Sequence, residues 1–214
     1  MRKISFIVGE YYHIYNRGVD KRSIFKNKKD LKRFLDSMNV FNSVETLGGL
    51  HLSRSESLAP VPRLVTFIAF CLNQNHYHFI LRSLVEGGIQ KFMHKLSTGY
   101  TNYFNERYER NGSLFQGPYK AVHIESNEQL LHASVYVNLN DRVHGDLNEK
   151  WLSELSFSSY SQYKTGDRKG FCDISVVLDQ YGHISEYTKN AESILVDILV
   201  RKERQKAVQK MIIE

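Results

Sequence analysis

Hydrophobic side chains recur along this chain with two periods, one typical of strands and the other of helices. The apolar run at residues 67–81 is interrupted by polar residues 73–75, which predicts two strands joined by a tight connection. Elsewhere, apolar residues spaced three or four positions apart predict amphipathic helices. In chain order, the expected elements are a strand at 11–18, a helix at 27–44, two strands within 67–81, a helix at 89–108, an extended segment at 114–124, a helix at 128–140 capped by Ser126, and a helix from Ile184 onward.

The order strand, helix, strand, strand, helix, strand, helix predicts the fold class. Helices interleaved with an antiparallel centre favour an α+β sandwich, in which helices pack on a ferredoxin-like antiparallel sheet. Glycine, serine and proline predict a loop at residues 46–63 and a linker at residues 165–170. We therefore expect a main domain over residues 1–165 and a helical C-terminal extension over residues 166–214.

His76 and His78 lie two residues apart in the strand predicted after the tight connection. Residues i and i+2 of a strand project from the same face, so both imidazoles point one way while Tyr77 points toward a core. Two neighbouring imidazoles can hold one divalent metal ion. A pair of hydrogen-bonded histidines on a sheet surface fits this short motif equally well, so the spacing leaves both interpretations open.

Tyr136 and Asn140 lie four residues apart in a predicted helix, which puts them on one helix face. A tyrosine beside a metal ion can act as a nucleophile, but its free pKa of about 10 means that it needs a cation that polarises the attacked phosphate. The amide oxygen of Asn140 is a hard donor suited to Mg²⁺ or Mn²⁺. Spacing alone favours a core position for Tyr136, and Tyr100 and Tyr103 are rival tyrosines in a helix whose pattern also indicates packing.

Composition adds a preference for an anionic partner and for a reducing compartment. The 214 residues carry a formal net charge of +6, and 13 Tyr and 12 Phe provide rings that can stack on bases or fill a core. The two cysteines, Cys71 and Cys172, fit neither a zinc spacing nor a disulfide framework. No apolar run reaches transmembrane length and the N-terminal one is too short for a signal peptide, so we expect a cytoplasmic protein without membrane contact.

Several blocks of residues, in their order along the chain, resemble the REP-associated tyrosine transposases, a branch of the single-tyrosine HUH transposases. They are residues 12–18 (YHIYNRG), 73–80 (NQNHYHFI), 100–105 (YTNYFN) with 112–120 (GSLFQGPYK), 136–140 (YVNLN), and Trp151 followed by 157–160 (FSSY). Together they cover roughly residues 11–163, which makes the resemblance far more specific than any single block. One position departs from the family pattern, since Asp141 stands where the family usually has proline.

The resemblance implies a fold of the HUH endonuclease type and a metal-dependent reaction on single-stranded DNA. It assigns His76 and His78 as the histidine pair, Asn140 as the third ligand of Mg²⁺ or Mn²⁺, and Tyr136 as the nucleophile. The implied transposase cleaves hairpin DNA of the repeat-associated type, forms a 5′-phosphotyrosine intermediate and rejoins strands, as a monomer or a homodimer. The alternative functions are an HUH nickase of the replication-initiator or relaxase type, and a catalytically idle DNA-binding protein on the same scaffold.

Basic and aromatic residues near these blocks are candidates for DNA contacts. The candidates are Arg17, Lys21, Arg22, Arg107, Arg110, Tyr119 and Lys120. Lysine and arginine neutralise phosphates and tyrosine stacks on unpaired bases, but a solvated basic face and a packed tyrosine account for the same residues equally well.

Overall fold

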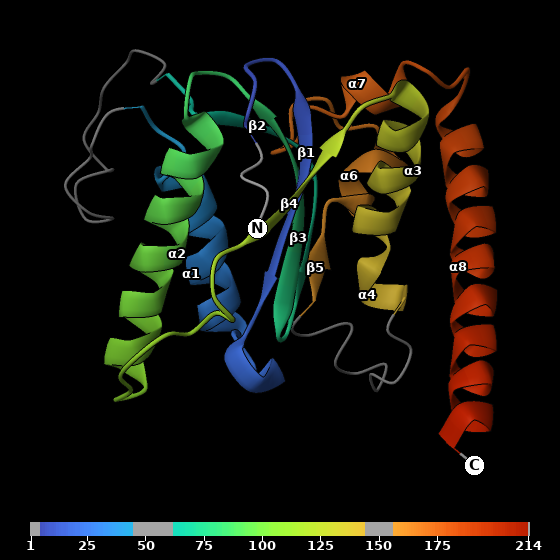
Figure 1. The fold of residues 1–214 in the computed structure, drawn as a ribbon. Coiled ribbons are helices and arrows are strands. Elements are labelled where there is room, and N and C mark those ends of the chain that lie inside the picture. Colours follow the sequence, from blue (N-terminus) through green and yellow to red (C-terminus); the bar gives the residue numbers. More distant parts are fainter. Residues whose placement is uncertain (1–4, 45–61, 144–155, 214) are drawn as a thin grey trace.

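The computed structural model describes residues 5–44, 62–143 and 156–213 of the chain. Within them, a five-stranded antiparallel sheet stands between two groups of helices (Figure 1). Its strands are β1, Tyr11–Arg17; β2, Val65–Asn73; β3, His76–Ser83; β4, Lys120–Ile124; and β5, Phe157–Ser158. They follow the order β4-β1-β3-β2-β5. The predicted α+β fold with a ferredoxin-like antiparallel sheet is confirmed.

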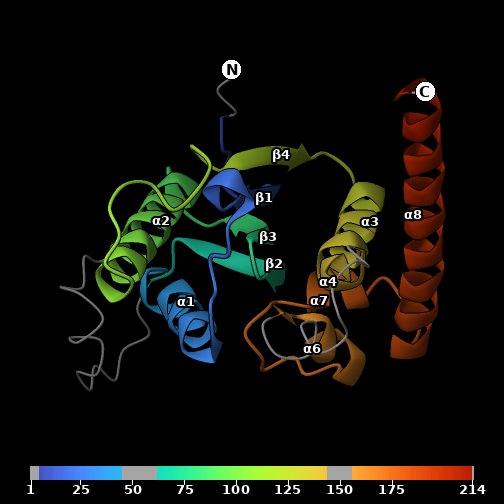
Figure 2. The ribbon, with the colours of Figure 1, turned by 90° about the horizontal axis from the view of Figure 1, so that it is seen from below.

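Helices pack on both faces of this sheet. They are α1, Lys28–Val40; α2, Gly88–Arg107; α3, Asn127–Asn138; α4, Asn140–Val143; α6, Tyr160–Thr165; α7, Ser175–Leu178; α8, Ile184–Ile213; and a short 3-10 helix, η1, Val19–Lys21. Helices α1 and α2 lie on one side of the sheet and α3 and α4 on the other, with α8 along the outer side of α3 (Figure 2). No helix in the described ranges has both the length and the apolar character needed to cross a membrane.

Local sequence signals set several of these boundaries. The Asn27 side chain accepts two backbone hydrogen bonds at the start of α1. Ser126, the predicted cap, accepts one from the backbone nitrogen of Gln129 at the start of α3. Strands β2 and β3 are joined by residues 74–75 alone, so the tight connection predicted between them is present.

Two predicted elements differ from the structure. Of the extended segment at 114–124, only the final 5 residues form a strand, because the chain turns at Gly117, whose φ of 67° suits glycine. The helix predicted through residue 140 ends at Asn138. At Leu139 the backbone leaves the helical region, with φ −107° and ψ 13°, and a new helix begins at Asn140. The buried Asn140 side chain is hydrogen-bonded to the sheet, which accounts for the break.

The C-terminal segment packs on the same core as the rest of the described chain. Cys172, Ile174 and Val177 are buried with residues of the sheet, and α8 contacts α3, α4 and α6. The helices of this segment are α7 and α8, and the division of the chain at residue 165 stays a prediction. Trp151 and most of the loop predicted at 46–63 lie outside the described residues.

Asp30 is a fully buried carboxylate between α1 and α2. It accepts hydrogen bonds from the Tyr103 hydroxyl at 3.0 Å, the Tyr108 hydroxyl at 2.6 Å and the Lys26 backbone nitrogen at 2.8 Å, and Arg107 Nε lies 3.4 Å away. We expect Asp30→Ala to lower the free energy of unfolding by about 2–4 kcal/mol, because these donors lose their acceptor. Urea denaturation measures the change.

Asp36 provides the matched control on the same helix. It pairs with Lys32 at 2.9 Å, and the two side chains are 46% and 75% exposed, respectively. Asp36→Ala is therefore expected to cost less than about 1 kcal/mol. Equal stability of the two variants would show that the Asp30 network contributes no more than a surface pair.

Candidate active site

Alternation along β1 and β3 places four ring side chains on the sheet face that α3 covers. His76 and His78 of β3 share this face with His13 and Tyr15 of β1, and Tyr15 pairs with His78 across the strands. Tyr77 projects to the opposite face, where it is fully buried against α1. The structure thus agrees with the predicted directions of the two histidines and of Tyr77.

The hydrogen bonds of His76 determine which ring nitrogen can bind a cation. Nδ1 of His76 lies 2.6 Å from Oδ1 of Asn75, whose amide nitrogen donates to the backbone oxygen of Lys21. Because Oδ1 can only accept, Nδ1 carries the proton and Nε2 carries the lone pair. Burial lowers the pKa of His76, with the neighbouring Asn140 side chain acting in the opposite direction. The ring is therefore neutral at neutral pH, which is the form that binds metals.

Nε2 of His76 faces the amide oxygen of Asn140. These two atoms lie 3.0 Å apart, and Nδ2 of Asn73 lies 2.9 Å from each of them. The Asn73 amide is oriented in turn by the Ser156 hydroxyl, which donates to its Oδ1 at 3.2 Å. Nδ2 of the buried Asn140 has no hydrogen-bond partner among the described residues. The lone pair of His76 Nε2 and the amide oxygen of Asn140 therefore both face the amide NH2 group of Asn73, as they would face a bound cation.

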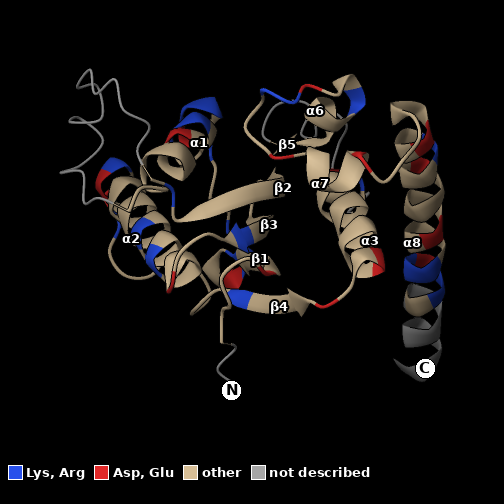
Figure 3. Cartoon of the chain, turned by 90° about the horizontal axis from the view of Figure 1, so that it is seen from above, with Lys and Arg blue, Asp and Glu red and all other residues tan. Residues whose placement is uncertain are grey.

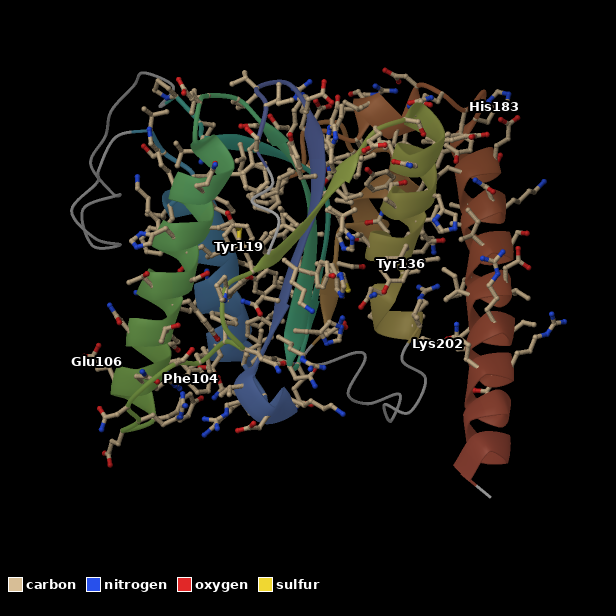
Figure 4. The ribbon with its side chains drawn as sticks, in the orientation of Figure 1. Phe104, Glu106, Tyr119, Tyr136, His183 and Lys202 are labelled. Carbon is tan, nitrogen blue, oxygen red and sulfur yellow. The ribbon has the colours of Figure 1, made fainter. Side chains whose placement is uncertain are left out.

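His78 and Tyr136 complete this arrangement. Nδ1 of His78 lies 2.9 Å from Nε2 of His13, and the two rings are stacked. The Tyr136 ring of α3 lies edge-on to both, with centroid distances of 5.8 Å to His78 and 6.0 Å to His13. These ring contacts place the side chain of Tyr136, labelled on α3 in Figure 4, on the side of the helix that faces the sheet. The four predicted residues, His76, His78, Tyr136 and Asn140, are thus brought together within one chain.

Burial controls the protonation of the groups around the Tyr136 hydroxyl. It raises the pKa of Tyr136 above its ordinary value, with the Asn140 side chain acting in the opposite direction. The phenol is therefore neutral at neutral pH and needs nearby positive charge before it can act as a nucleophile. Burial also lowers the pKa of His13 to about 4, so this ring is neutral too.

The donor set fits the divalent ion expected from the sequence. Among the described residues, no three His, Cys, Asp or Glu side chains come together as a metal site. The candidate ligands are instead two imidazoles and one amide oxygen, from His76, His78 and Asn140. Mixed nitrogen and oxygen donors of this kind suit a divalent ion that keeps further positions for water or phosphate oxygens.

The rival tyrosines lie on the other side of the sheet. The Tyr100 hydroxyl donates to the backbone oxygen of Ile24 at 2.6 Å, and the Tyr103 hydroxyl donates to Asp30. Burial raises the pKa of Tyr100 far above its ordinary value. Both hydroxyls are engaged within the α1–α2 layer and face away from the two histidines, which fits the packing roles expected for them.

Two of the predicted DNA contacts lie near the histidines. Nζ of Lys120 is 6.0 Å from the ring centroid of Tyr15, and the charge of Arg17 acts on His76. Arg17 is hydrogen-bonded to Gln116. Both basic side chains therefore lie at the edge of the face that carries the candidate site.

The remaining candidates lie farther from that face or are engaged elsewhere. Lys21 ends η1 and Arg22 follows it, with Arg22 paired to Asp20 at 3.5 Å; Arg107 contacts Asp30; Arg110 is bonded to Asn105; and Tyr119 lines a groove along α2. Basic segments are spread over several elements of the molecule (Figure 3). A role in DNA binding stays a prediction for each of the seven residues.

Sequence reasoning missed His13 and Asn73. His13 lies on the same face as Tyr15 and Arg17, so the period of two that was applied to β3 also identifies it on β1. Asn73 pairs directly with His76 across the two-residue connection. The pairing register of the predicted hairpin is therefore the sequence signal that places Asn73 beside His76.

Comparisons with known proteins bear on the fold and on the central part of the chain. Residues 63–140 match the protein-family model described as transposase IS200 like, and this range contains all four predicted site residues. A solved structure of a REP-associated tyrosine transposase bound to a REP hairpin is similar in fold, with a TM-score of 0.56 and 14% sequence identity over 77% of this chain and 85% of that chain. No curated protein matches the chain. These similarities confirm the resemblance found in the sequence blocks.

Proposed function

We propose that this chain, similar to IS200-like transposases over residues 63–140, is a metal-dependent endonuclease and strand transferase for single-stranded DNA. The observation that supports this best is the position of Tyr136 over His78, with His76 and Asn140 converging beside it. A tyrosine hydroxyl, two imidazoles and an amide oxygen lie together on one side of the sheet, which supports the proposed roles of nucleophile and cation ligands. A catalytically idle DNA-binding protein has no need of this arrangement.

The proposed chemistry is a transesterification at phosphorus. The Tyr136 hydroxyl oxygen bonds to the scissile phosphorus as the bond from phosphorus to the 3′ oxygen breaks. The phenolic proton is lost, and a proton reaches the departing 3′ oxygen. The product is a 5′-phosphotyrosine link and a free 3′-OH, and attack by a 3′-OH on that link rejoins a strand. No nucleotide cofactor is required, because the covalent link retains the phosphodiester.

Residues of this chain prepare the reaction before any DNA binds. His76, His78 and Asn140 would hold Mg²⁺ or Mn²⁺, which supplies Lewis acidity toward a phosphate oxygen. Asn75 keeps the lone pair of His76 on Nε2, and Asn73 orients the Asn140 amide. Neutral His13 can accept a hydrogen bond at Nε2 from the Nδ1–H of His78, which leaves the lone pair of the His78 ring on Nε2.

The proposed substrate is a DNA hairpin with an unpaired flank. The structurally similar transposase is described as bound to a REP hairpin, and the sequence blocks resemble the same family. Arg17 and Lys120 at the edge of the site are placed to neutralise phosphates of the flank. Because nucleophile and ligands come from one chain, a monomer contains a whole site and a homodimer is not needed to complete it.

Incubation with an end-labelled hairpin and Mn²⁺, followed by a denaturing gel, tests the proposal. A labelled band that survives denaturation and disappears after protease treatment supports the enzyme. Binding without any such adduct would favour the idle DNA-binding protein. Nicking without transfer to a second labelled strand would favour the alternative HUH nickase.

His13 supports a further prediction about metal affinity. His13→Ala removes the group bonded to Nδ1 of His78 and frees that ring to change tautomer. We expect about 10- to 100-fold weaker Mn²⁺ binding, measured by titration calorimetry. His123→Ala is the control, because His123 stacks on Tyr12 at the opposite face. Equal Mn²⁺ affinity of the two variants would contradict a role for His13.

A further inference from the structure

We propose that Asn138, Ser159 and Tyr187, together called the Asn138 clamp, position the Tyr136 helix for attack. This inference rests on the proposed function. Ser159 and Tyr187 lie beyond residue 140, where the match to the family model ends. The clamp therefore gives the C-terminal segment a part in the reaction, although none of its three residues touches the reacting atoms.

The clamp is a continuous line of hydrogen bonds through the interior. The backbone nitrogen of Phe70 in β2 donates to Oγ of Ser159 at 2.9 Å, and Ser159 donates to Oδ1 of Asn138 at 2.5 Å. Nδ2 of Asn138 donates to the Tyr187 hydroxyl of α8 at 2.8 Å. Asn138 and Tyr187 are fully buried and Ser159 is 2% exposed, so water does not replace these bonds.

Further contacts hold Tyr187 and helix α8 at one end of the line. The Tyr187 ring stacks on that of Tyr163 with a centroid distance of 4.9 Å, and the Tyr163 hydroxyl donates to the backbone oxygen of Ile68 in β2 at 2.9 Å. Farther along α8, Nζ of Lys202 donates to the backbone oxygen of Val143 at the end of α4 at 2.8 Å. Helices α3, α4 and α8 are thus connected to the strand that pairs with β3.

Asn138 occupies the position from which the tyrosine helix is best controlled. It is the last residue of α3, two positions after Tyr136, and points about 200° around the helix from it. Tyr136 therefore faces the histidines when Asn138 faces α6 and α8. Asn138 also precedes the break at Leu139 that places Asn140 against His76. The hydrogen bonds of its amide oxygen and amide nitrogen consequently fix both the rotation of α3 about its axis and the position at which α4 starts.

Small rotations of α3 matter because the hydroxyl of Tyr136 lies far from the helix axis. An atom about 6 Å from the axis moves by about 1 Å when the helix rotates by about 10°. A displacement of about 1 Å can lower a reaction rate by about 100-fold. Loosening the clamp is therefore expected to slow the covalent step while DNA still binds.

Tyr187→Phe and Asn138→Leu test this in the full-length chain. We expect the rate constant of adduct formation at saturating hairpin DNA to fall about 10-fold in Tyr187→Phe and about 100-fold in Asn138→Leu. The Kd for DNA is expected to change by less than about twofold, because no DNA contact is removed. A wild-type rate constant in both variants, or a loss confined to DNA affinity, would overturn the proposal.

Asn42→Ala controls for a merely structural effect. Asn42 is 5% exposed and makes three hydrogen bonds to the backbone of Leu64 and Val65, at the opposite side of the molecule. The Asn42→Ala variant loses a buried amide comparable to that of Asn138. Its free energy of unfolding is therefore expected to fall at least as much as that of Asn138→Leu, while its rate constant of adduct formation stays at the wild-type value. An equal slowing in Asn42→Ala would assign the effect to stability and overturn the clamp.

Hydrogen exchange tests the clamp without relying on catalysis. Amides of residues 134–140 are expected to exchange about tenfold faster in Tyr187→Phe than in the wild-type chain, whereas those of β3 stay unchanged. Unchanged exchange at 134–140 would overturn the clamp. If the wild-type chain forms no adduct, the proposed function fails, and this measurement still decides whether α3 is held by Tyr187.

Discussion

Tyr136→Phe is expected to abolish the covalent protein–DNA adduct, because it removes one oxygen atom that the proposed reaction places between protein and phosphorus. The ring remains, so its edge-on contacts with His78 and His13 persist and the fold is retained. Adduct formation should fall to the background of a reaction without protein, a loss of about 1,000-fold or more. Binding of hairpin DNA should stay close to that of the wild-type chain.

Tyr103→Phe is the matched control for this experiment. It also removes one phenolic oxygen, but from a side chain bonded to Asp30 on the other side of the sheet. Its expected effect is a modest loss of stability with an unchanged rate of adduct formation. An adduct that persists in Tyr136→Phe and disappears in Tyr103→Phe would show that the nucleophile is misassigned.

Removal of the divalent ion is expected to have an effect of similar size. Dialysis against a chelator should eliminate cleavage, and added Mn²⁺ should restore it, whereas added ATP should change nothing. Asn140→Ala should weaken Mn²⁺ binding and lower the rate of cleavage by about 100-fold or more, because the only oxygen ligand proposed from the protein is lost. Calorimetry and the adduct gel measure the two effects separately.

Asn105→Ala is a suitable control for Asn140→Ala. Its amide bonds Arg110 and the backbone of Gly112, outside the candidate site. This variant should bind Mn²⁺ and cleave DNA as the wild-type chain does. Full cleavage by the chelated wild-type chain would contradict a metal-dependent mechanism.

Periodicity predicted most of the fold because the elements around the sheet have one clearly apolar face. The strands of the β2–β3 hairpin, the helix after residue 87 and the cap at Ser126 all agree with sequence signals that act within a few residues. The break at Leu139 was not predicted. It depends on two residues more than 60 positions earlier that no local pattern records: Asn73, which donates a hydrogen bond to the Asn140 amide oxygen, and His76, which lies beside that oxygen.

In the candidate site, too, local sequence patterns predict some features and tertiary packing determines the others. The common face of His76 and His78 follows from the period of two, but the sequence alone left Tyr136 more plausible as a core residue than as a nucleophile. Its place over the histidines is set by the packing of α3 on the sheet. The clamp through Ser159 and Tyr187 was missed altogether, because these residues meet Asn138 only through tertiary contacts.

The pairing register of β3 has a consequence for how this site tolerates change in chain length. His76 and His78 face α3 only because strand β3 keeps its present phase against β1 and β2. Insertion of one residue between His78 and Phe79, with the rest of the strand still paired, would turn both imidazoles into the apolar layer beneath α1. All four candidate site residues would still be present in such a chain, but His76 and His78 would no longer face Tyr136. Whether the number of residues along β3 is odd or even therefore matters to this candidate site as much as the identity of its proposed ligands.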